Sequence, residues 1–420
     1  MKYLEKLLKD FQNIPQNIIL HADILRRGIK LNEDLKRAGK ESCQTGIATK
    51  LQYHILNQKD LPPSQFHFTS DETTVDIKID KNSPYEIKEL SSKEYHLCAG
   101  DRDFGRVRFT KRPKYADKNT SDGQECQFLL MQRGSFCLLV SPLDFCAYLK
   151  KGDACKYCIL SPAMDIAIER KIMKPIPDHD IIAEAVEIAC KEDVKLRDLK
   201  LSGGALYNTK KEAEYYKSCL SAILERIDPP EEITIFSQAF DKEDQMDLKE
   251  MGTTNVIFNL EVWNEQLWPK LLPGKTKAIG REEWIKRLKD AVDIFGRGHV
   301  SCSFVAGFEC APKEGFLTQE DSFNAYLTAF EFLLKRDIVP SFTIWTPYPL
   351  VGGFKEKDPP DTEWYLKLGV KHHEMLEKYE MYKSLGFPHY GVDPPTLGLY
   401  CYYCFSMQFL RDFPRLINRD

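Results

Sequence analysis

The second part of the chain alternates two kinds of segment, and this alternation restricts the fold more than any other feature. Short β-branched or apolar runs recur from about residue 134, and each predicts a strand: Ser135–Pro142, Leu199–Ser202, Ile233–Ser237, Asn255–Glu261, His299–Gly307 and Val339–Thr346. Amphipathic stretches between them predict helices: Asp180–Lys191, Lys210–Ile227, Arg281–Phe295 and Gln319–Lys335. Strands joined by helical crossovers are parallel. The pattern predicts an α/β fold, a (β/α)6 partial TIM-type barrel that the tail could close further. A doubly wound sheet is the alternative that periodicity leaves open.

The segments before and after this region lack the alternation. Two helices and two short strands are expected in the first region: Met1–Gln12, Gln16–Ala38, Thr74–Ile79 and Gly105–Thr110. A Pro/Gly-rich passage after Thr346 leads into a helix expected at Asp361–Leu385. We therefore expect an N-terminal α+β accessory region at 1–133, the barrel at 134–350 and a C-terminal extension at 351–420.

Charge and composition exclude several classes of protein. The 420 residues carry 59 Lys and Arg against 63 Asp and Glu, a net charge of −4. This balance argues against a nucleic-acid-coating surface or a polybasic membrane anchor. The sequence has no apolar run of 18 residues, and charges near Met1 occupy the place of a signal peptide's apolar core. We expect a soluble, cytoplasmic protein. In a reducing compartment its 13 cysteines are core residues or metal ligands rather than disulfides.

Three of these cysteines follow the first predicted barrel strand closely. Cys146, Cys155 and Cys158 have the spacing C-x8-C-x2-C. Three thiolates cannot complete a four-ligand structural zinc site, but they can hold a [4Fe–4S] cluster that keeps one iron open to a small ligand. Thiols in a loop are exposed and oxidisable, which favours a ligand role over ordinary loop cysteines.

The end of this motif resembles a known family signature. Cys155-Lys156-Tyr157-Cys158 is similar to the C-x-aromatic-C ending of the radical S-adenosylmethionine (SAM) signature, in the loop after the first strand of a (β/α)6 barrel. The resemblance implies a [4Fe–4S] cluster on Cys146, Cys155 and Cys158, with Tyr157 beside the cofactor. Most members have three residues in the first gap, whereas this chain has eight. The identity of Cys146 as the first ligand therefore stays open, and Cys137, inside the strand, is a poorer candidate.

The ends of later strands also resemble this family, and barrel active sites form at such ends. Gly203-Gly204 follows the second strand like the family's Gly-Gly-Glu motif, whose backbone contacts the SAM amino group; Ala205 replaces the acid. Asn259 and Glu261 end the fourth strand as in the biotin synthase and hydrogenase-maturase branch. There an Asn-Leu-acid triplet meets the SAM ribose.

The resemblance assigns three further residues to SAM. In that branch, an Arg on the helix after the fourth strand pairs with the SAM carboxylate. Arg287 is the candidate here, and Arg281 is a second candidate. The alternative is that Arg287 is an ordinary solvent-exposed charge on its helix. Glu309, in Gly307-Phe308-Glu309 at the end of the fifth strand, resembles the acid of the family's Gly-x-x-Glu strand end beside adenine. Thr346 ends the sixth strand, which offers adenine apolar and backbone contacts.

The remaining cysteines give weaker expectations. Cys401 and Cys404 form a C-x2-C pair that is a candidate for an auxiliary metal or cluster, but two thiolates need further ligands such as His389 or Cys310. A structural turn is the alternative. Cys302, inside the fifth strand, is expected to be a buried small hydrophobe.

The resemblance implies a radical SAM enzyme, oxygen-sensitive and iron–sulfur dependent. Such an enzyme cleaves SAM reductively to a 5′-deoxyadenosyl radical that abstracts hydrogen from substrate. We expect a small-molecule substrate and a flavodoxin- or ferredoxin-type electron donor, with no membrane or nucleic-acid partner. The long first gap leaves a second product open, a 3-amino-3-carboxypropyl radical. A non-catalytic zinc scaffold on Cys146, Cys155, Cys158 and a tail cysteine is the alternative outside this class.

Overall fold

The computed structural model describes most of the chain: residues 2–42, 61–71, 73–133, 137–158, 168–169, 174, 176–192, 194–311, 316–345, 359–381 and 405–406. Within these residues no helix is both long and apolar enough to cross a membrane.

A seven-stranded sheet forms the centre of the second region. Its strands lie side by side in chain order: β6 (Leu130–Arg133), β7 (Cys137–Val140), β8 (Asp198–Ser202), β9 (Glu232–Ser237), β10 (Asn255–Phe258), β11 (Val300–Ala306) and β12 (Val339–Ile344). Strands β7 to β12 are parallel, whereas β6 pairs antiparallel with β7. All six predicted strands are therefore confirmed. Because the strand order never reverses, the doubly wound alternative is wrong.

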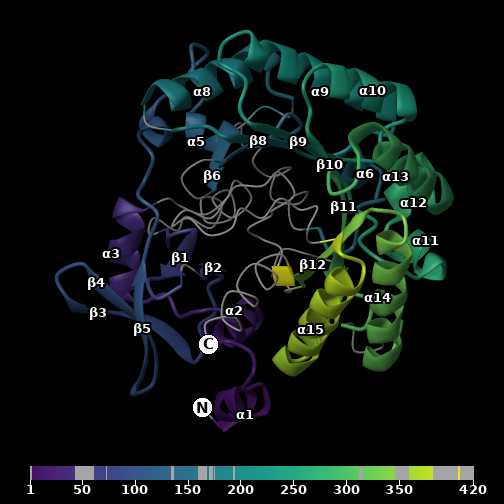
Figure 1. Ribbon diagram of the computed structural model, residues 1–420. Coiled ribbons are helices and arrows are strands. Elements are labelled where there is room, and N and C mark those ends of the chain that lie inside the picture. Colours follow the sequence, from purple (N-terminus) through teal and green to yellow (C-terminus); the bar gives the residue numbers. More distant parts are fainter. Residues whose placement is uncertain are drawn as a thin grey trace.

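Helices cover the outside of this curved sheet (Figure 1). They are α8 (His179–Glu192), α9 (Thr209–Leu224), α10 (Lys242–Glu250), α13 (Arg281–Phe295) and α14 (Gln319–Leu334). All residues of β10 and β11 are buried, as expected for parallel strands covered on both faces. The fold is the predicted α/β fold with a parallel sheet, consistent with a partial TIM-type barrel.

A second, antiparallel sheet precedes it. Its five strands have the order β2-β1-β5-β4-β3: β1 (Gln65–Phe68), β2 (Thr74–Asp76), β3 (Tyr85–Ser91), β4 (Glu94–Ala99) and β5 (Arg102–Arg108). Short helices flank it: α1 (Lys2–Asp10), α2 (Gln16–Arg27), α3 (Glu33–Glu41), η1 (Lys114–Asp117) and α5 (Cys126–Leu129). The expected α+β character is confirmed. Strand β6 joins the larger sheet although it precedes residue 134, where we expected the barrel to begin.

The single helix expected at Gln16–Ala38 is wrong. Helix α2 ends at Arg27 because Gly28 has a φ of 71° and lies against the segment after β2, where an added Cβ would be 2.8 Å from the Lys78 carbonyl oxygen. Helix α3 then begins after Asn32, whose side chain accepts a hydrogen bond from the Leu35 backbone N–H.

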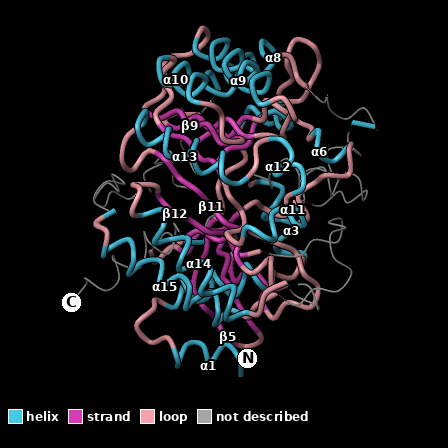
Figure 2. Tube along the Cα trace, turned by 90° about the vertical axis from the view of Figure 1, so that its right-hand side faces the viewer, coloured by secondary structure: helices cyan, strands magenta, loops and turns pink. Residues whose placement is uncertain are grey.

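Helix α15 (Thr362–Lys378) packs against α2 and α14. It ends earlier than the predicted Leu385. The Arg26 guanidinium donates to the Pro360 carbonyl at 2.6 Å, and the Thr362 hydroxyl donates to the buried Asp23 carboxylate at 2.6 Å. Helix α2 therefore holds the start of α15 beside the barrel. Figure 2 shows α1 at the end of the molecule opposite α9 and α10.

Candidate functional site

The three motif cysteines lie in the loop that leaves β7 at the carboxyl end of the sheet. Cys146, Cys155 and Cys158 are partly buried free thiols, and α6 (Ala147–Lys150) lies between the first two. Burial raises the pKa of the Cys146 thiol, and nearby Cys158 raises it further. Burial also raises the pKa of Cys155, which Lys275 opposes and Cys158 and Cys146 increase. The three thiols therefore share one environment, and this donor set fits a cluster with three protein ligands.

The segment after β8 holds one side of this loop. The Gly204 N–H donates to the Leu143 carbonyl, and the Ala147 N–H donates to the Ala205 carbonyl, both at 2.8 Å. A Cβ on Gly204 would lie 1.8 Å from the Phe145 carbonyl oxygen. Gly203 and Gly204 are therefore required for the cysteine loop to approach β8. Their contact with SAM stays a prediction.

The segment after β10 holds the other side. It contains η2 (Glu265–Leu267), α11 (Trp268–Leu271) and α12 (Pro273–Ala278). The Lys156 N–H donates to the Leu271 carbonyl, and the Gly274 N–H donates to the Asp153 carbonyl, both at 3.0 Å. The cysteine loop is thus fixed between the segments that follow β8 and β10.

Glu261 sits at the end of β10 in an uncommon backbone conformation. Its φ is 65°, and its backbone exchanges hydrogen bonds with β11, to the Ser303 carbonyl and from the Val305 N–H. The Asn259 side-chain oxygen accepts from the Ser303 N–H at 2.9 Å. Asn259 thus ties β10 to β11, while the chain turns at Glu261 and continues the pairing.

The Glu261 carboxylate meets the cysteine loop. It is 7% exposed. Burial raises the pKa of the Tyr157 hydroxyl, and the Glu261 charge is close enough to raise it further, while Lys275 Nζ lies 2.9 Å from Glu261 Oε1. The structure therefore brings together Tyr157, Cys155 and Glu261, which the sequence placed in one site.

Lys275 is a residue of this site that the sequence motifs did not indicate. In the sequence it lies within α12 and does not follow a strand directly. The sequence Pro273-Gly274 signals the start of a short helix, but nothing in it indicates that the next side chain turns toward Glu261.

The two arginine candidates point to different places. Arg287 Nε lies 2.9 Å from Glu283 on its own helix, and its Nη1 donates to the Ala239 carbonyl after β9 at 2.9 Å. No contact of Arg287 with Glu261 is found among the described residues. Arg281 Nε donates to the Trp263 carbonyl at 3.2 Å, and the guanidinium covers the Trp263 ring at 4.5 Å. Of the two, Arg281 is the one near the strand ends that carry Glu261.

Glu309 is enclosed at the end of β11. It is 2% exposed, and its two oxygens accept from the Ser322 and Tyr326 hydroxyls of α14, each at 2.7 Å. Burial raises its pKa to about 7, and these hydrogen bonds oppose the rise. Within the described part of the chain, no hydrogen bond or ion pair joins the Glu309 carboxylate to the cysteine loop. Its predicted place beside adenine therefore gains no support from this geometry.

Four other predicted residues lie outside the described part of the chain: Thr346, His389, Cys401 and Cys404. Cys302 is fully buried, as expected for a small hydrophobe, and its sulfur accepts from the Leu260 N–H at 3.4 Å. Cys310 is also buried and donates to the Gly307 carbonyl.

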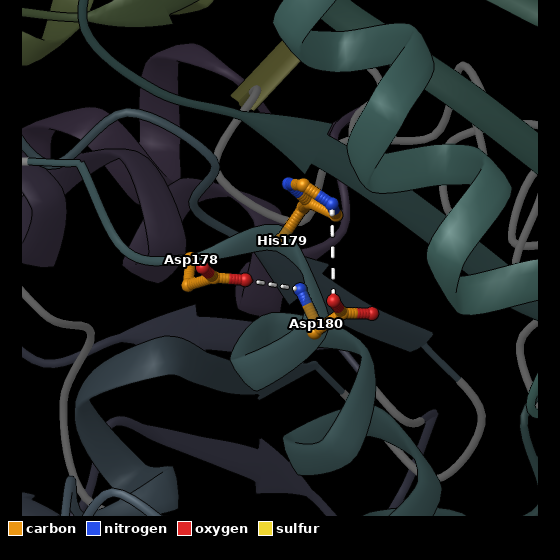
Figure 3. Close-up of side chains that lie close together, drawn as sticks. All are labelled: Asp178, His179 and Asp180. Atoms are coloured by element: carbon orange, nitrogen blue, oxygen red, sulfur yellow. Dashed lines mark hydrogen bonds and ion pairs between the residues drawn. The ribbon is translucent and has the colours of Figure 1, made fainter.

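One compact group of metal-ligand types occurs elsewhere. Asp178, His179 and Asp180 have ligand atoms within 4.8 Å of one another (Figure 3). Asp178 accepts from the Asp180 N–H at 2.9 Å, and His179 Nε2 lies 3.9 Å from the Asp180 carboxylate. Both aspartates are exposed, so the group is an ordinary cap at the start of α8.

Comparison with known proteins finds distant relatives. A bacteriochlorophyllide c C-7(1)-hydroxylase from Chlorobaculum limnaeum is 22% identical over 242 residues, which are 54% of this chain and 57% of that protein. The FeFe-hydrogenase maturase HydG from Carboxydothermus hydrogenoformans aligns with a TM-score of 0.43 and 13% identity, over 60% of this chain and 56% of that chain. Coproporphyrinogen III oxidase HemN from Escherichia coli gives 0.40 and 14%, over 62% and 55%.

The known proteins that this chain resembles are radical SAM enzymes. This is the family that the sequence motifs resemble. The chain spans just over half the length of each of the relatives described above. No model of a protein family matches it.

Proposed function

We propose that this chain is a radical SAM enzyme whose site lies at the carboxyl end of the parallel sheet. The observation that carries the proposal is the meeting of Tyr157 and Cys155, from the loop after β7, with Glu261, from the end of β10. These residues belong to separate motifs, about 100 positions apart in the sequence. Their convergence on one edge is expected of a barrel active site.

Each part of the chain has a defined task in this proposal. Cys146, Cys155 and Cys158 hold a [4Fe–4S] cluster and leave one iron without a protein ligand. The Glu261 carboxylate accepts the SAM ribose hydroxyls. Gly203 and Gly204 keep the loop against β8, and Arg281 is the arginine assigned to the SAM carboxylate.

A bound cluster supplies the electron for reductive cleavage of SAM, which gives a 5′-deoxyadenosyl radical that takes hydrogen from substrate. We infer a small-molecule substrate and a flavodoxin- or ferredoxin-type donor. The hydroxylase relative supports hydrogen abstraction as the reaction class, because hydroxylation replaces a carbon-bound hydrogen.

Product analysis under anaerobic conditions tests the proposal. The reconstituted protein, given SAM and a strong one-electron reductant, should release 5′-deoxyadenosine. Methylthioadenosine instead would indicate the 3-amino-3-carboxypropyl variant of the class. Absence of both products, in a protein that binds stoichiometric zinc, would establish the zinc scaffold and overturn the proposal.

Cysteine variants provide the matched control. Cys155→Ala should lose the cluster and SAM cleavage. Cys190→Ala, which removes another partly buried thiol on α8, should retain both. Iron in excess of one cluster per chain in the unmodified protein would indicate an auxiliary site at Cys401 and Cys404.

A further inference from the structure

Lys275 is a buried lysine that belongs to none of the family motifs. Its Nζ donates to Glu261 Oε1 and to the Asn259 carbonyl, each at 2.9 Å. It also lies 4.6 Å from the centre of the Trp284 ring, on α13. The side chains of Lys275 and Glu261 are only 12% and 9% exposed. Helix α12 thus inserts one ammonium group between the end of β10 and the cysteine loop.

Burial of this ion pair is costly, so its geometry is informative. A lysine that loses water must recover the lost interaction from fixed partners. Here the partners are a carboxylate, a carbonyl and an aromatic face, and they hold the ammonium from three sides. Glu261 has a φ of 65°, a conformation that residues with a Cβ adopt rarely. The carboxylate is therefore set in one direction by its backbone and by Lys275 together.

We propose that Lys275 is a positioning residue that holds the Glu261 carboxylate beside Tyr157 in the orientation that accepts the SAM ribose. A carboxylate accepts about four hydrogen bonds, so the contacts with Lys275 and Tyr157 leave capacity for two hydroxyl donors. Without the ammonium, the carboxylate would lose its counter-charge and turn to other partners. The inference rests on the proposed function and adds to it a residue outside the family motifs.

The test measures SAM binding separately from cluster assembly. Lys275→Met keeps the length of the side chain and removes the charge, whereas Lys275→Arg keeps the charge. Lys286→Met is the control, because Lys286 forms an exposed ion pair with Asp290 on neighbouring α13. For each reconstituted protein we would measure iron content, the Kd for SAM by calorimetry, and KM and kcat for SAM cleavage.

We expect Lys275→Met to retain its iron and to bind SAM about 10- to 100-fold more weakly, the range for loss of a hydrogen bond to a charged group. KM should rise more than kcat falls. Lys275→Arg should recover most of the affinity, and Lys286→Met should match the unmodified protein. Unchanged affinity in Lys275→Met, or no recovery in Lys275→Arg, would overturn the inference.

A double variant separates positioning from general support of the fold. If Lys275 acts through Glu261, then Lys275→Met combined with Glu261→Gln should bind SAM no more weakly than Glu261→Gln alone. Additive losses would show that Lys275 acts otherwise and would overturn the inference. This variant leaves no buried charge unpaired, so it remains informative if Lys275→Met alone does not fold. If the unmodified protein assembles no cluster and cleaves no SAM, the proposed function itself fails, which is a distinct result.

Discussion

Two neighbouring strands end in a buried glutamate, and the two glutamates have opposite surroundings. Glu261, after β10, faces the ammonium of Lys275 and the Tyr157 hydroxyl of the cysteine loop. Glu309, after β11, faces two hydroxyls of α14. Position at a strand end therefore determines the edge of the sheet at which a side chain lies. The residues that the following turn packs against that side chain determine whether it is available to a ligand.

The backbone explains the difference. Glu261 itself has a left-handed backbone conformation, and its N–H and carbonyl continue the hydrogen bonding with β11. Its side chain therefore lies beside the cysteine loop. Beyond Gly307, in contrast, the chain turns away from the strand, and the Glu309 carbonyl accepts from Phe316 and Leu317 N–H groups just before α14. That turn packs Glu309 against the helix.

The largest expected difference between the two glutamates is in SAM affinity. Glu261→Ala should weaken binding by about 2–3 kcal/mol, roughly 100-fold, because hydrogen bonds to a charged group are lost. Glu309→Ala should leave the Kd unchanged. Calorimetry on cluster-loaded proteins of equal iron content measures both. Normal SAM binding by Glu261→Ala would remove Glu261 from the site.

Alanine substitutions at two glycines extend the comparison between the two regions. A Cβ on Gly204 would strike the cysteine loop, whereas a Cβ on Gly307 would lie 2.4 Å from the Tyr365 hydroxyl of α15. Crowding of this kind costs about 1–3 kcal/mol, so both alanine variants should unfold at lower urea. Only Gly204→Ala should also lose iron on reconstitution. Equal iron loss in Gly307→Ala would show that the two strand ends are not independent.

Glu309 should matter for stability. Glu309→Ala removes the carboxylate that accepts from the buried Ser322 hydroxyl and leaves the Tyr326 hydroxyl its longer hydrogen bond to the Val305 carbonyl, at a cost of about 1–3 kcal/mol in the free energy of unfolding. Urea titration checks this value. Glu309→Gln, which keeps an acceptor oxygen, should lose less; a loss as large as in Glu309→Ala would mean that the hydrogen bonds contribute little.

The last expected difference is in pH dependence. Burial raises the pKa of Glu309 from 4.5 to about 7, so in this pH window the folded protein keeps a proton that the unfolded chain has released. The stabilisation is fully present below about pH 4.5 and is lost as the pH rises through about 7. The unfolding free energy of the native protein should therefore fall relative to Glu309→Gln between these values. A constant difference between the two proteins would show that Glu309 does not titrate there.

The sequence predicts the strands well and side-chain directions poorly. All six barrel strands were found because short runs rich in apolar and β-branched residues, such as Val300–Ala306, are typical of buried parallel strands. Helix breaks were harder to predict: Gly28 interrupts an otherwise continuous amphipathic pattern because the segment after β2 lies against it. Strands β3 and β4 were not anticipated, although in β3 the apolar residues Tyr85 and Ile87 alternate with charged ones.

The same distinction holds for the candidate site: residues that follow strands could be placed from the sequence, and the partners of residues on helices could not. Cys146, Cys155, Cys158 and Glu261 lie just after strands, and parallel strands bring the segments at their carboxyl ends to one edge of the sheet. Arg287 lies on a helix, where spacing alone did not show that its partners would be Glu283 and the Ala239 carbonyl. Lys275 comes from a loop helix whose position depends on contacts with the cysteine loop, and no local pattern encodes those contacts.

The central claim is that the cysteine loop holds a [4Fe–4S] cluster with one iron open to SAM. Electron paramagnetic resonance of the anaerobically reconstituted and reduced protein, recorded with and without SAM, tests it most directly. We predict the signal of a reduced [4Fe–4S] cluster that changes when SAM is added and is absent in Cys158→Ala. A colourless zinc protein, or a cluster signal that SAM leaves unchanged, would contradict the account.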